Sequence, residues 1–161
     1  MSSLLTSLPK LLPVAFAWAE EQERLILDQG VPLTEAETDD ARRAGVVHPE
    51  KIRVLRVETL PEPKHDEALF MAKTIGLFSP RSTGLTLGHG ICLRRDAWEN
   101  RHILVHECVH VSQYEKIGGI RPFLSLYLRE SIDPGYPFGA LEREAIYVSS
   151  DICRKKATPD T

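Results

Sequence analysis

The spacing of apolar residues along the chain separates helical segments from extended ones. Apolar residues that recur about every 3.6 positions, between a capping residue or proline and a later glycine, are typical of helices. We expect helices over residues 14–29, 34–45, 97–116, 122–132 and 137–155. Thr34 and Glu37 have the three-residue spacing of a capping box, and Asp96 is placed to cap the helix that follows it.

Strict alternation of polar and apolar residues marks the extended segments instead. Residues 51–58 alternate in this way and predict a half-buried strand, whereas residues 66–75 fit a short helix. Residues 84–93 also alternate, and they contain glycines of the kind that mark a bulge or the close approach of another backbone. We expect residues 84–93 to form one edge strand.

The order of these elements, helices, then strands, then helices again, predicts an α+β fold. A chain of 161 residues is long enough for one stable core, so we expect a single small domain over residues 1–161. The domain should be mostly helical, with a short edge-stranded sheet that precedes the helix at 97–116.

Composition and charge narrow the class of protein. The 20 Lys and Arg are interspersed among 23 Asp and Glu, which leaves no basic face for nucleic acid. No apolar run approaches the roughly 20 residues of a membrane span. Three cysteines without a CxxC pair fit a reducing compartment. The apolar stretch around Pro13 is too short and interrupted for a cleaved signal peptide, so we expect a cytoplasmic protein.

The segment from His106 to His110 reads His-Glu-Cys-Val-His and falls inside a predicted helix. Residues four apart lie one turn apart on the same helix face, so two imidazoles there can bind one zinc ion. Glu107 is rotated away by one residue, which leaves it placed to act as a general base on a nearby water. A catalytic zinc site needs a third protein ligand, and the last helix offers Glu142 and Glu144.

The motif resembles that of the zincin metallopeptidases that use a glutamate as third ligand. The stretch from about residue 84 to 147 is also similar to small uncharacterised bacterial proteins with an HExxH domain, so the motif-bearing part covers about 84–155. In several zincin branches a small residue follows the third ligand after three positions, which favours Glu142 because Ala145 stands there. The thermolysin-like pattern, with alanine directly after the glutamate, favours Glu144. The acidic residue that zincins often carry four places after this glutamate is absent.

The resemblance implies a zinc-dependent metallopeptidase in which Glu107 activates water for cleavage of a peptide bond in a peptide or protein substrate. It also implies that the segment 84–93 pairs with an extended substrate and that a Tyr or His stabilises the oxyanion. We expect Tyr136 to do so, with the other candidates being His89, Tyr114 and Tyr127. We expect His102 to be a surface or capping residue and Gln113 to serve packing. The alternatives are a catalytically weak or inactive zincin-like metal-binding module with a regulatory role, and a metal-free helical scaffold.

Overall fold

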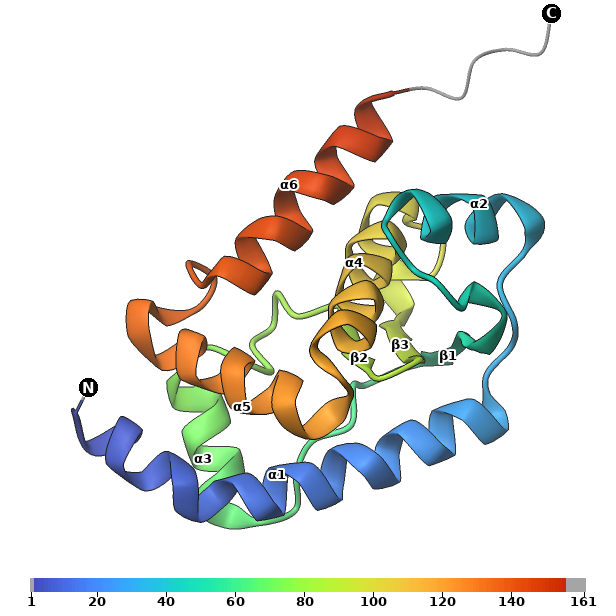
Figure 1. Ribbon diagram of the computed structural model, residues 1–161. Helices are drawn as coiled ribbons and strands as arrows, with labels where there is room; N and C mark the ends of the chain where they lie inside the picture. Colours follow the sequence, from blue (N-terminus) through green and yellow to red (C-terminus); the bar gives the residue numbers. More distant parts are fainter. Residues whose placement is uncertain (1, 156–161) are drawn as a thin grey trace, which may run out of the picture.

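The computed structural model describes residues 2–155 and confirms a mostly helical α+β fold (Figure 1). The helices are α1 (Ser2–Gln29), α2 (Glu35–Arg43), α3 (Asp66–Thr74), α4 (Arg101–Ile117), α5 (Ile120–Glu130) and α6 (Ala140–Arg154). The strands are β1 (Arg53–Val57), β2 (Gly84–Leu87) and β3 (Gly90–Arg94). No helix among the described residues is long and apolar enough to cross a membrane.

The three strands form one small sheet in the order β1-β3-β2. β3 lies in the centre, parallel to β1 and antiparallel to β2. The prediction of a single edge strand over residues 84–93 was therefore wrong, because a two-residue turn at Gly88 and His89 divides the segment into a hairpin. Gly88 has a φ of +62°, a value that glycine adopts without strain, and the alternation of faces breaks at this point.

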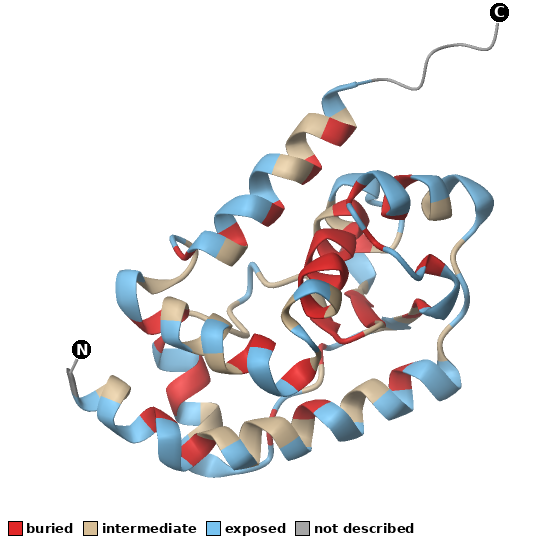
Figure 2. Cartoon of the chain, in the orientation of Figure 1, coloured by how far each residue is buried: buried red, intermediate tan, exposed pale blue. Residues whose placement is uncertain are grey.

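Helix α4 is the central element of the fold. Nearly every residue from Leu104 to Tyr114 is buried, and Figure 2 shows α4 as an almost continuous buried segment. α4 contacts β2, α2, α5 and α6. The Asn100 side chain caps its start by accepting a hydrogen bond from the Ile103 amide, and Gly118 ends it with a φ of +111°. The helix thus begins later than predicted, because Asp96 pairs with Arg94 instead of capping it.

Helix α1 begins well before Pro13, where its start was predicted. Pro9 and Pro13 lie inside the helix. Proline removes a helical hydrogen bond, but apolar burial holds this part of the helix in place. Leu8 and Leu11 are buried in a cluster with Met71 of α3, Ile75 at the C-cap of α3 and Ile132 in the turn after α5. Tertiary packing therefore overrides the local signal for a helix start.

The remaining predicted elements are present with shifted ends. The Thr34–Glu37 capping box forms at the start of α2, and residues 66–75 contain α3. α5 begins at Ile120, two residues before the proline expected to open it, and α6 begins at Ala140.

Glu115, near the end of α4, ties two loops to the central helix. Its carboxylate accepts hydrogen bonds from the backbone amides of Val47 and His48, at 2.8 and 3.0 Å. It also lies 3.1 Å from Nε2 of His89 in the hairpin turn. Burial raises the pKa of this carboxyl, but the hydrogen bonds outweigh it and hold the pKa below its ordinary value.

Candidate metal centre

The two motif histidines project from the same face of α4, one turn apart. Their ring centroids lie 4.9 Å from each other. His110 is buried and the side chain of His106 is one-fifth exposed. Helical geometry alone accounts for this pairing, as the sequence predicted.

The third member of the cluster is Glu142, in the first turn of α6. Its Oε1 lies 2.9 Å from Nε2 of His106, and its Oε2 lies 3.2 Å from Nε2 of His110. The ligand atoms of all three residues lie within 4.8 Å of one another. Glu144, the alternative third ligand, is exposed and accepts a hydrogen bond from Gln113 instead.

Small residues on α6 allow this meeting of two helices. The buried face of α6 consists of Glu142, Ala145, Ser149 and Ile152, which follow one another at helical spacing. Ala145 and Ser149 are fully buried. Ala145 packs in the same core cluster as Val105 and Val109 of α4. Since neither side chain is large, α6 lies close enough for the Glu142 carboxylate to reach both histidines.

The electrostatics of the cluster favour a negative carboxylate. Burial by itself raises the Glu142 pKa, but hydrogen bonds from His106 and His110 more than offset it and hold the pKa well below the ordinary range. Burial lowers the His110 pKa, but the hydrogen bond to Glu142 and the charges of Glu107 and Glu142 raise it overall. The buried groups are thus mutually compensated even as a metal-free set.

A network around Gln113 orients His110. The Gln113 amide nitrogen donates to the Leu141 carbonyl at 2.9 Å and to Glu144 at 3.1 Å, so its amide oxygen faces His110. That oxygen lies 2.8 Å from Nδ1 of His110 and accepts a hydrogen bond from it. Gln113 was expected only to pack. A polar residue at i+3 from His110, within a buried helix, was the signal that sequence reasoning overlooked.

The donor set fits a divalent metal. With Nδ1 of His110 donating to Gln113, loss of the Nε2 proton on metal binding would leave a lone pair on Nε2, which faces the cluster. In a tetrahedral zinc site with bonds of about 2.0–2.1 Å, ligand atoms lie about 3.3 Å apart. The 2.9 and 3.2 Å separations between Glu142 and the histidines are close to that value. Two imidazoles and one carboxylate are a ligand set that zinc accepts.

Glu107 points to a different neighbour, β2. Its Oε2 accepts a hydrogen bond from the Thr86 hydroxyl at 2.5 Å, and its Oε1 accepts none from any described residue. Gly84 permits the close approach of strand and carboxylate, since a Cβ built there would lie 2.5 Å from Oε1. The glycine noted in the sequence therefore admits a side chain of the protein itself.

Two tyrosines lie beside the cluster. The Tyr127 hydroxyl donates to Oε2 of Glu142 at 3.0 Å, and burial together with the Glu142 charge raises its pKa well above the ordinary value. Tyr136 lines the same pocket, and burial, then Glu142 and Glu107, raise its pKa to about 12. Both hydroxyls stay protonated at neutral pH and can donate hydrogen bonds.

The other residues considered in the sequence interact with groups outside the His106–His110–Glu142 cluster. His89 lies beside Glu115 in the hairpin turn, and it is not among the residues that line the pocket. The Tyr114 hydroxyl donates to the Thr86 carbonyl at 3.0 Å. His102 is exposed and lies 3.4 Å from the Ser150 hydroxyl.

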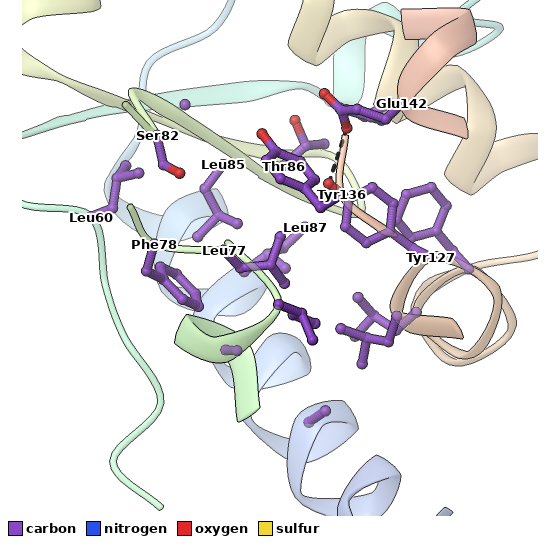
Figure 3. Close-up of a pocket in the computed structure, with 18 of the residues that line it drawn as sticks. Leu60, Leu77, Phe78, Ser82, Leu85, Thr86, Leu87, Tyr127, Tyr136 and Glu142 are labelled. Carbon is purple, nitrogen blue, oxygen red and sulfur yellow. Dashed lines mark hydrogen bonds and ion pairs between the residues drawn. The ribbon is translucent and has the colours of Figure 1, made fainter. Parts of the chain in front are cut away.

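The cluster opens into a pocket of about 350 Å³. Figure 3 shows Glu142, joined to Tyr127 by a dashed line, at one end of this pocket and leucine and phenylalanine side chains over much of the rest. A concave, mostly apolar site with a few convergent polar groups is the usual form of a small-molecule or substrate site.

Comparison of the chain with protein-family models, with curated proteins and with solved structures finds no match. Function is therefore inferred from the residues of the site itself.

Proposed function

We propose that the protein is a zinc-dependent hydrolase of the metallopeptidase type, similar to zincins, that cleaves an amide bond. The observation that carries the proposal is the convergence of His106, His110 and Glu142, with ligand atoms within 4.8 Å, beside Glu107 in a pocket. His106, His110 and Glu142 would hold the metal. When bound, zinc would supply a Lewis acid that polarises a carbonyl and makes water more acidic.

The remaining catalytic and positioning roles would fall to side chains of the protein. Glu107 would remove a proton from the attacking water through its free Oε1 and then pass it to the leaving amine. Thr86 would hold the other oxygen and so fix the direction of the carboxylate. Tyr136, protonated at neutral pH, would donate a hydrogen bond to the oxygen that gains negative charge. Tyr127 and Gln113 would orient Glu142 and His110.

Metal analysis and one matched pair of variants test the proposal. We expect one zinc per chain in the wild type and in Glu107→Gln, and a loss of zinc in Glu142→Gln. Turnover of peptide or amide substrates should be present in the wild type and absent in Glu107→Gln. A purified protein that takes up no zinc after incubation with the metal would overturn the proposal.

A second reading, a zincin-like module that binds metal without catalysis, is favoured by one observation. Glu107 is buried and its Oε2 is held by Thr86, which restricts its movement as a base. A cellular function that survives Glu107→Gln but is lost in Glu142→Gln would support the module. Loss of that function in both variants would support the hydrolase.

A further inference from the structure

The pocket beside the His106–His110–Glu142 cluster is lined in part by two adjacent helices. α1 and α3 contact each other, and each contributes a stripe of lining residues at helical spacing. The stripe on α1 consists of Leu8, Leu11, Ala15 and Trp18. The stripe on α3 and its C-cap consists of Ala68, Met71, Ala72 and Ile75. Three of these eight residues are alanines, which fill less of the pocket than larger side chains would.

The pocket is apolar away from the cluster. The segment after α3 and strand β2 add Leu77, Phe78, Leu85 and Leu87, and Figure 3 shows these side chains on the side of the pocket away from Glu142. The charged residues that line the pocket are Glu107 and Glu142 of the site and the exposed Arg81. An unfilled apolar space weakens a fold because its lining lacks dispersion contacts. This lining therefore favours an uncharged apolar ligand group.

The pocket is larger than one aliphatic amino-acid side chain. A methylene group occupies about as much space as a water molecule, roughly 30 Å³, so 350 Å³ corresponds to about twelve such groups, and the part away from the cluster accommodates about eight to ten carbons. A leucine side chain, with four carbons, would leave more than half of that space empty.

An extended peptide is a poorer fit to the strand beside the site. Thr86 and Leu87 of β2 are buried, and the Thr86 carbonyl already accepts a hydrogen bond from Tyr114. β3 is the central strand and is paired on both sides. Little of the segment 84–93 is therefore free to pair with a substrate backbone.

We propose that this pocket binds an unbranched acyl chain of about eight to ten carbons, so that the substrate is the amide of a medium-chain acyl group. The inference rests on the proposed hydrolase function and names its substrate class. The chain lies along the residues that α1 and α3 contribute to the pocket, and the amide carbonyl lies at the His106–His110–Glu142 cluster. Water adds its oxygen to the acyl carbon, the carbon–nitrogen bond breaks, and the proton passes to the amine. The products are a fatty acid and an amine.

Calorimetric titration with n-alkanoic acids tests the occupant directly. The zinc-loaded protein is titrated with acids from about four to fourteen carbons, and the expected Kd falls about fourfold for each added methylene. The fall should stop at about ten carbons, when the pocket is full. The metal-free protein should show the same dependence on length with weaker binding overall. A Kd that does not change with chain length in either metal state would refute the acyl-chain site.

Two alanines on α1 provide a matched pair of variants. Ala15 lines the pocket and Ala17 is exposed on the same helix. Ala15→Phe should raise the Kd for decanoate at least tenfold and leave that for butanoate unchanged, whereas Ala17→Phe should change neither. Ala68→Phe, on α3, repeats the test from the neighbouring helix if Ala15→Phe unfolds. Unchanged decanoate binding in a folded pocket variant would contradict the inference.

Turnover assays distinguish a failure of the acyl-chain site from a failure of the proposed hydrolase function. Zinc-loaded protein should cleave decanoyl anilide with a higher kcat/KM than butanoyl anilide or leucyl anilide, and Glu107→Gln should cleave none of them. Binding that depends on chain length without any turnover would overturn the hydrolase and retain the acyl-chain site. Equal cleavage of all three anilides would overturn the acyl-chain site and retain the hydrolase.

Discussion

Replacing Gly84 with alanine tests the contact between β2 and the Glu107 carboxylate. The added Cβ would lie 2.5 Å from Oε1, 2.9 Å from Cδ and 3.0 Å from Cγ of Glu107. Glu107 is 6% exposed and bonded to Thr86, so moving away from the added Cβ would cost this hydrogen bond. Overpacking of this kind costs about 1–3 kcal/mol of unfolding free energy.

Gly84→Ala should have the opposite effect on the free energy of unfolding when the Glu107 carboxylate is absent. Alanine is favoured over glycine within a strand by roughly 0.5–1 kcal/mol because glycine loses more backbone freedom on folding. In a Glu107→Ala background the three clashing atoms are gone, so Gly84→Ala should stabilise the fold. The coupling between the two positions should therefore be about 1.5–4 kcal/mol, the sum of the two effects.

Thermal and urea unfolding of all four proteins measure this coupling. For a chain of this length each kcal/mol shifts Tm by about 2–4 °C, so Gly84→Ala alone should lower Tm by roughly 2–12 °C. Zinc content should be unchanged, because the strand does not contact the ligands through Gly84. Equal effects of Gly84→Ala with and without Glu107 would refute the steric argument and the position of the base.

Three further predictions follow from the hydrogen bonds around the site and at Glu115. Gln113→Ala should weaken zinc binding about 10–100-fold by freeing the His110 ring; competition with a chelator measures this, and unchanged affinity would contradict the orienting role. Tyr127→Phe should reduce the unfolding free energy in urea by about 1.5–3 kcal/mol, because its hydroxyl bonds the charged Glu142 carboxylate; no loss would show that the bond does not contribute. Because the Glu115 pKa is lowered in the fold, its contribution is present above the unfolded pKa of about 4.3 and is lost as pH falls through the folded value. Urea unfolding from pH 7 to 3 should therefore show a smaller acid-induced loss in Glu115→Gln than in the wild type, and parallel curves would exclude this linkage.

Local patterns predicted most of the helices and the central motif, but not where chain segments reverse or begin. The hairpin within residues 84–93 was missed because Gly88 and His89 interrupt an alternation that otherwise reads as one strand. The start of α1 was misplaced because Pro13 is a local signal. The burial of Leu8 and Leu11 against α3 is a long-range effect.

At the site, too, local patterns determined some features and contacts between distant segments determined the others. The sequence determined that His106 and His110 lie one turn apart with Glu107 beside them, since helical periodicity depends only on nearby residues. Only the tertiary structure shows that Glu142, and not Glu144, lies beside the two histidines. That choice depends on which face of α6 packs against α4, and the buried Ala145 and Ser149 place Glu142 on that face. The contacts of Gln113 with α6 and the apolar pocket lined by α1 and α3 likewise arise from contacts between distant segments, which a linear pattern does not record.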